Sequence, residues 1–127
     1  MIKRLLQAGV TVQRYDAYST DSIYLKLDYG VCNSIRIGGH PGKGYLKYRY
    51  NIGGYIKKFK EKNNMVFYPS DKSKNLVRRI LKDREIKIQR YGKEQYRHYM
   101  KKNLDENKNH KGFWKQARLI TDFGGNE

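Results

Sequence analysis

Apolar and polar residues alternate with a period of two through much of the first half of the chain. The alternating runs fall at about 10–13, 23–28, 35–37 and 46–52, with further short runs at 55–60 and 65–68. Turn-forming residues separate them at 29–30, 38–44, 53–54 and 63–64. Strict alternation is typical of strands with one buried and one solvated face. The pattern therefore predicts an antiparallel β-meander of four to six strands over residues 10–68.

From residue 69 onward the period becomes helical. Pro69 ends the strand pattern, and Ser70 or Asp71 is placed as the N-cap of a helix. Apolar residues then recur at intervals of three and four up to Tyr91, and Gly92 either caps or bends this helix. A second helical stripe continues to residue 104, so the helical part is predicted over about 71–104.

Both ends of the chain carry short apolar segments. Residues 2–8 predict a short helix ended by Gly9, and residues 112–121 predict a C-terminal clasp that docks on the core. The 127 residues suffice for one compact domain and are too few for two with separate cores. We therefore expect a single α+β domain over 1–127, in which the sheet packs against a long helical segment.

Charge narrows the class of partner. The chain has 28 Lys and Arg against 12 Asp and Glu, a formal charge of +16, which attracts polyanions. Twelve Tyr and four Phe argue against a disordered basic tail. No apolar run approaches the length of a membrane span, and the single cysteine, Cys32, excludes an internal disulfide. These features predict a cytoplasmic protein without a membrane partner.

Cations gather on one face of the predicted sheet. No acidic residue occurs between Tyr29 and Lys60. The alternation places four cations and one ring on the polar face, namely Tyr24, Lys26, Arg36, Lys47 and Arg49. A basic sheet face with aromatic rings is typical of single-stranded nucleic-acid binding, in which phosphates meet cations and bases stack on rings. The alternative is a solvated face whose charges supply solubility.

The predicted helix carries a second group of cations. Lys74, Arg78 and Lys82 follow i,i+4 spacing, and pairs such as Asp83–Lys87 offset only part of the charge. Such a ridge would complement the backbone of a duplex or a folded RNA, and the alternative is an ordinary solvated helix face. We expect the sheet face and the helix ridge to support each other in binding.

The glycine-rich loop 38–44 is a third candidate. It lacks the spacing of a P-loop and of a dinucleotide fingerprint. His40, Lys43 and exposed backbone N–H groups are nevertheless candidate contacts for an anion. A plain hairpin loop is the alternative.

Catalysis has little support in the residues. The three histidines lie far apart and show no metal-ligand spacing, and one cysteine cannot build a zinc site. A divalent-metal nuclease needs convergent carboxylates, for which only Asp16, Asp21 and Asp28 are available before residue 61. No catalytic residue, metal ligand or cofactor is therefore assigned, and a small metal-dependent nuclease is the weakest hypothesis.

Several segments together resemble a known kind of protein. They are SIYLKLDYG at 22–30, SIRIGGH at 34–40, RYG at 90–92 and the closing GFWKQARLI at 112–120. They resemble small proteins carried by phages and mobile elements of Gram-positive bacteria, and the Ser-x-Tyr strand followed by Arg-Ile-x-x-His is similar to a segment of some anti-CRISPR inhibitors. The resemblance implies a role in countering host defence or in phage regulation, inside the bacterial host cell, and transfers no catalytic residue.

Charge and resemblance lead to one expected function and one alternative from another class. We expect a protein that binds RNA, DNA or a Cas-type ribonucleoprotein, and inhibition of an RNA-guided nuclease is the particular role that the resemblance implies. The sign of the charge excludes mimicry of DNA and favours occupation of the guide RNA. The alternative is a basic adaptor that binds an acidic protein surface without nucleic acid.

Overall fold

The computed structural model describes residues 1–17, 21–38, 47–52, 65–108 and 117–120. Its helices are α1 (Ile2–Gln7), α2 (Ser73–Tyr91) and α3 (Lys93–Lys108), with short 3₁₀ turns at Asp28–Gly30 and Ser70–Lys72. Its strands are β1 (Val12–Asp16), β2 (Ile23–Leu27), β3 (Ser34–Ile37), β4 (Tyr48–Asn51), β5 (Met65–Tyr68) and β6 (Arg118–Ile120).

The strands form one antiparallel sheet in the order β5-β4-β3-β2-β1-β6. The prediction of an α+β fold with an antiparallel sheet and a long helical segment is confirmed. The sheet also takes in β6, which lies within the predicted clasp and pairs with the free edge of β1. The remaining clasp residues, 112–116 and 121, lie outside the described residues.

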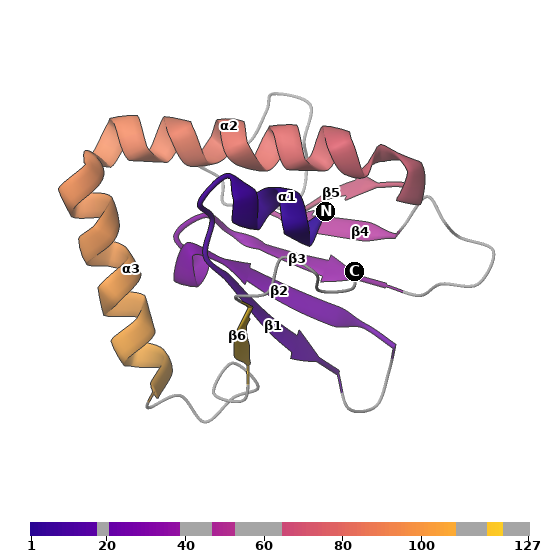
Figure 1. Ribbon diagram of the computed structural model, residues 1–127, viewed down its shortest axis with the longest axis horizontal. Helices are drawn as coiled ribbons and strands as arrows, with labels where there is room; N and C mark the ends of the chain where they lie inside the picture. The colour runs from indigo at the N-terminus through magenta and orange to yellow at the C-terminus, as the bar shows by residue number, and fades with distance from the viewer. Residues whose placement is uncertain (18–20, 39–46, 53–64, 109–116, 121–127) are drawn as a thin grey trace.

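Two helices cover one face of the sheet. Figure 1 shows α2 running the width of the molecule, with α1 lying between it and the strands. Alternate sheet residues such as Leu25, Ile35 and Tyr50 are fully buried in one cluster with Leu76 and Ile80 of α2. The period-two and helical patterns therefore meet in a single core, which also holds Tyr48 and Tyr50 as their spacing predicts.

The helical part differs from the prediction at its start. Ser70 and Asp71 belong to a 3₁₀ turn in which Lys72 N donates to Pro69 O at 3.0 Å. The helix α2 begins at Ser73 after Lys72, without a side-chain cap, so the predicted N-cap is wrong.

Gly92 ends α2 and redirects the chain. Its φ is +85° and its N–H donates to Ile88 O at 2.8 Å, after which α3 begins at Lys93. A positive φ is readily adopted only by glycine. Figure 1 shows the result, with α3 turning away from the end of α2 along the side of the sheet.

The turn between β2 and β3 has an unusual backbone. Asp28, Tyr29 and Asn33 have φ values of 49°, 55° and 69°. Such conformations cost about 1 kcal/mol or more at each non-glycine residue. Gly30 has φ +93°, a conformation that favours glycine, whereas the Lys26 side chain, 2.9 Å from where a Cβ would lie, is flexible and could shift. The backbone conformation of this turn therefore requires stabilising contacts with residues outside the turn.

The stabilisation comes largely from the fully buried carboxylate of Asp28. It accepts hydrogen bonds from Thr11 N at 2.9 Å, from Arg84 Nε at 2.6 Å and from the Tyr96 hydroxyl. Burial by itself lowers the pKa of Arg84, but the hydrogen bond to Asp28 and its charge outweigh burial and raise the pKa. One side chain thus joins the start of β1, the turn, α2 and α3.

A second polar layer lies beside this carboxylate. Asp83 accepts from Arg79 Nε at 2.9 Å and from the Tyr50 hydroxyl at 2.9 Å. Lys87 Nζ donates to Val31 O at 2.7 Å and to Asn33 Oδ1 at 2.9 Å. The predicted Asp83–Lys87 pair is therefore wrong, because Asp83 pairs with Arg79. Burial lowers the pKa of Lys87.

Cys32 lies in the same turn and is fully buried. Its thiol donates to Ile80 O at 3.8 Å, and burial raises its pKa to about 12. The thiol therefore behaves as a small core group rather than a nucleophile.

None of the described helices is long and apolar enough to cross a lipid bilayer.

The first prediction concerns the buried carboxylate. Asp28→Asn keeps the shape of the side chain but leaves Arg84 without its counter-charge. Breaking a buried pair in this way should lower the free energy of unfolding by about 3 kcal/mol, measured by urea denaturation. The matched control is Asp16→Asn, which removes the exposed partner of Arg14 and should cost less than about 1 kcal/mol. Equal effects of the two variants would contradict the central role of Asp28.

Candidate functional site

The sheet face opposite the core carries a continuous row of aligned side chains. Tyr15 pairs with Tyr24, Tyr24 with Arg36, Arg36 with Arg49, and Arg49 with Phe67. Directly paired residues project from the same face of a sheet. We call these five residues the arginine row. The core cluster, with the α1 and α2 residues in it, lies on the other face of the sheet in the described ranges.

The arginine row crosses five neighbouring strands. With strands about 4.8 Å apart, it spans about 19 Å from β1 to β5. Rings occupy both ends and guanidinium groups occupy the middle. The arrangement therefore offers two central positive charges between aromatic surfaces.

Arg36 is held in a defined orientation. Its Nε and Nη2 donate to Ser22 Oγ at 3.2 and 3.1 Å. Its Cζ lies 6.0 Å from the centroid of the Tyr24 ring, within the range of a cation–π contact. The guanidinium is therefore positioned before any ligand arrives.

Arg49 faces Arg36 directly and is less well satisfied. Like charges in directly opposed positions are destabilising. The Nε of Arg49 is buried and has no hydrogen-bond partner in the described part of the chain. A buried donor without a partner costs about 1–3 kcal/mol. An anion placed between Arg36 and Arg49 would relieve the repulsion between the two guanidinium groups.

The rings differ in exposure. The Tyr15 and Tyr24 rings are half-buried, with centroids 6.5 Å apart and planes tilted by 41°. At the other end Phe67 is 47 % exposed. Two further apolar residues lie on this face near its edges, Met65 at 38 % and Leu119 at 49 % exposure. Phe67 is thus the most open ring of the row.

The structure brings together three of the predicted sheet residues and leaves two at the margin. Tyr24, Arg36 and Arg49 are contiguous in the arginine row. Lys26 lies on the same face but is half-buried near Gly30, and burial lowers its pKa while the charge of Glu106 opposes the shift. Lys47 is half-buried, and its carbonyl accepts from Gly38 N at 2.9 Å, which continues the pairing of β3 with β4.

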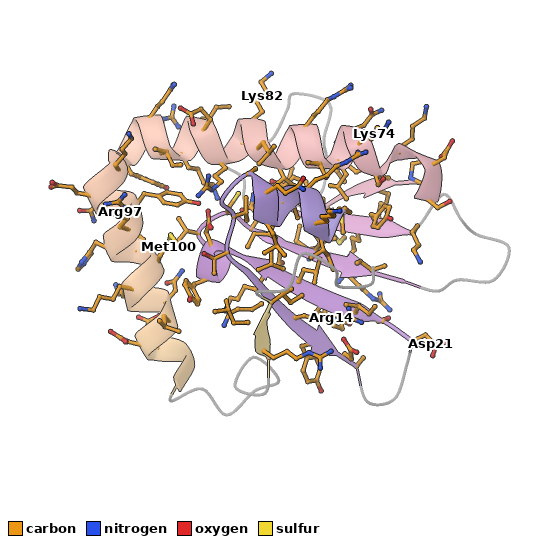
Figure 2. All side chains as sticks on the ribbon, viewed as in Figure 1. Arg14, Asp21, Lys74, Lys82, Arg97 and Met100 are labelled. Carbon is orange, nitrogen blue, oxygen red and sulfur yellow. The ribbon has the colours of Figure 1, made fainter. Side chains whose placement is uncertain are left out.

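Two other predicted sites do not join the row. His40 and Lys43 lie outside the described residues. Lys74, Arg78 and Lys82 are exposed on α2, on the side of the helix away from its buried residues. Figure 2 shows Lys74 and Lys82 pointing away from the sheet. The core separates the helix ridge from the arginine row, so one bound strand would not contact both, and their joint role in binding stays a prediction.

Sequence reasoning missed three contributors to the site. Continuing the alternation from Val12 by three positions places Tyr15 on the polar face, so this residue could have been found. Phe67 lies in a strand of four residues whose register with β4 is not visible in the sequence. Ser22 acts on Arg36 from a neighbouring strand end, and only the pairing of β2 with β3 shows it.

The carboxylates in the described part of the chain do not build a metal site. Within the described ranges, no group of three His, Cys, Asp or Glu side chains could hold a metal ion. Asp16 accepts from Arg14 Nε at 2.7 Å, a hydrogen bond that lowers its pKa. Asp28 lies at the other end of the β1–β2 pair and already accepts three hydrogen bonds. The arrangement gives the nuclease hypothesis no support.

The opposed arginines generate a prediction about the free protein. Arg49→Gln removes one of two like charges and should raise the free energy of unfolding by about 0.5–1 kcal/mol at low salt. The gain should shrink as salt screens the charges. Urea denaturation at low and high salt measures it, with Lys47→Gln as the control. A loss of stability larger than about 1 kcal/mol would show that Arg49 is a structural residue.

Comparison with known proteins found no matching family model, no matching curated protein and no matching solved structure. The resemblance to anti-CRISPR and other phage proteins therefore stays a hypothesis. The function must be argued from the residues of the site.

Proposed function

We propose that the chain is a nucleic-acid-binding protein whose arginine row takes a single-stranded segment of RNA or DNA. The observation that carries the proposal is the direct opposition of Arg36 and Arg49, with the Nε of Arg49 buried and unpartnered. A phosphate is the anion that two guanidinium groups recognise best, because the planar donors match its oxygens.

The aromatic ends of the row favour a nucleic acid over a lone phosphate. Bases on either side of a phosphate held at Arg36 and Arg49 would reach Tyr24 in one direction and Phe67 in the other. Stacking of bases on aromatic side chains tolerates any sequence and adds to the electrostatic attraction. The bound strand would then run across the β-strands rather than along them.

A single strand fits this surface better than a duplex. The faces of bases in a duplex are stacked on each other and cannot reach Tyr24 or Phe67. Unstacked bases in loops and single strands can. The ridge of Lys74, Arg78 and Lys82 contributes to the general positive field and lies too far round the molecule to touch the same strand.

The resemblance to phage proteins suggests a particular partner. The guide RNA of a Cas-type ribonucleoprotein would supply phosphates and unstacked bases, and its occupation would inhibit the nuclease without mimicry of DNA. This narrower proposal places the protein in the cytoplasm of a bacterial host. It rests on the resemblance and on the sign of the charge, whereas the binding mode rests on the arginine row.

Charge reversal in the row tests the proposal. Arg36→Glu combined with Arg49→Glu should weaken binding of a fluorescent single-stranded oligonucleotide at least a hundredfold at low salt, because two charge-assisted contacts are lost. The one phosphate held between the two guanidinium groups contributes about −0.7 to the slope of log K against log salt for a single strand. The double variant should therefore also show a shallower slope.

The control makes the same change in charge elsewhere. Lys74→Glu combined with Lys82→Glu should weaken binding less than tenfold, because it alters only the general field. Circular dichroism of both variants confirms the fold. Equal losses in the two double variants would overturn the assignment of the arginine row. An acidic protein partner that survives nuclease treatment, with no oligonucleotide binding, would favour the adaptor alternative.

A separate prediction concerns stacking. Phe67→Ala should weaken oligonucleotide binding about 5- to 150-fold, corresponding to 1–3 kcal/mol for one stacked base. Phe67→Tyr retains a ring and should bind nearly as the original does. Leu119→Ala is the matched control, because Leu119 is equally exposed on the same face but belongs to the strand beyond β1. Equal losses for Phe67→Ala and Leu119→Ala would show that apolar contact, not stacking, operates here.

A further inference from the structure

We propose that the elbow between α2 and α3 is a second binding site, for a small ligand in which a phosphate is linked to a flat aromatic base. The site lies on the helical side of the molecule and does not share a residue with the arginine row. The proposal is therefore independent of the function proposed above.

The elbow contains a hollow of suitable size. It measures about 550 Å³ and is lined by Gly9, by one side of α2 and by the first two turns of α3. Small-molecule sites commonly fall between about 300 and 1,000 Å³. Figure 2 shows Arg97 and Met100 at the part of α3 nearest the end of α2.

Cations dominate the polar lining. The lining contains three cations, namely Arg84, Lys93 and Arg97, and one carboxylate, that of Glu85. The Glu85 carboxylate accepts a hydrogen bond from Gln89 Nε2 at 3.2 Å. Arg84 is fixed in place, because its Nε donates to Asp28 and its Nη2 donates to Gly9 O at 3.2 Å. Lys93 and Arg97 are exposed and have no ion-pair partner within the described ranges. The lining therefore combines one rigid guanidinium with two adjustable cations, which suits a phosphate group.

The rest of the lining is apolar or aromatic. Ile88 and Met100 contribute side chains from the two helices, and the Tyr96 ring forms part of the wall. The Tyr96 hydroxyl is bound to Asp28, so its ring is held still, and Arg84 Cζ lies 5.9 Å from the ring centroid. Apolar walls with a few convergent charges are typical of sites that bury the body of a ligand and orient its charged end. An aromatic ring carrying a phosphate satisfies both parts.

Two sources share this chemistry, namely a free mononucleotide and the 5′-phosphorylated end of a strand. Adenosine monophosphate is the probe for the first source. A short oligonucleotide with and without a 5′-phosphate, added to the Arg36→Glu, Arg49→Glu variant, is the probe for the second. Both probes engage groups on α2 and α3 together, so binding should also raise the melting temperature.

The experiment compares adenosine monophosphate with adenosine and with inorganic phosphate, by calorimetric titration of the full chain. We expect adenosine monophosphate to bind at least tenfold more tightly than either part. Lys93→Glu combined with Arg97→Glu should weaken its binding at least tenfold. Lys74→Glu combined with Lys82→Glu makes the same charge change on the outer side of α2 and should leave binding unchanged within about twofold.

The same titrations test whether the elbow site binds independently of the arginine row. The Arg36→Glu, Arg49→Glu variant should bind adenosine monophosphate as the original chain does, and loss of binding there would overturn the elbow as the site. Undetectable binding of adenosine monophosphate to the original chain at millimolar concentration would overturn the proposal, as would equal affinity for adenosine. With the site established, preference for the 5′-phosphorylated oligonucleotide assigns a strand end, and no preference assigns the free nucleotide.

Discussion

The carboxylate of Asp28 is the group on which the arrangement of the sheet and the two long helices depends. It is fully buried beneath a turn whose backbone is unfavourable at several positions, and it accepts hydrogen bonds from Thr11, just before β1, and from α2 and α3. A buried charge of this kind is tolerated only when it is paired and hydrogen-bonded. Because Arg84 and Tyr96 meet this requirement from different helices, the turn fixes where both helices lie. The same turn joins β2 to β3, and so sets the register that brings Tyr24 opposite Arg36.

The interior uses acidic residues that the surface lacks. Asp28 and Asp83 are buried and neutralise Arg84 and Arg79. A chain with only 12 acidic residues has few left to balance its outer cations. Each of these two pairs carries no net charge, so they leave the formal net charge of +16 unchanged.

The sequence predicted on which face of the sheet these side chains lie, but not which residues they contact. The period of two placed Tyr24, Arg36 and Arg49 on one face because strand residues alternate without exception unless a bulge intervenes. It did not show that Arg36 and Arg49 are directly opposed, since cross-strand register depends on turns and loops. The buried roles of Asp28 and Lys87 were missed for a different reason. Most of their hydrogen-bond partners lie 54 to 68 residues away, and a polar residue in an amphipathic pattern looks solvated until the packing of distant elements is known.

Burial, rather than the number of charges, distinguishes the arginine row from the ridge on α2. Lys74, Arg78 and Lys82 are exposed, and water and salt weaken any attraction between a phosphate and a fully solvated cation. Arg36 and Arg49 are partly withdrawn from water, and one of them already has its orientation fixed by Ser22. Under the proposed function, a phosphate between them would meet a lower effective dielectric constant, and the oriented Arg36 side chain would lose less conformational entropy on binding. The same reasoning applies to Arg84 at the elbow, where Asp28 holds the guanidinium in place. In this fold the cations best suited to specific binding are those whose orientation is fixed by hydrogen bonds, and the exposed cations would attract polyanions without selecting among them.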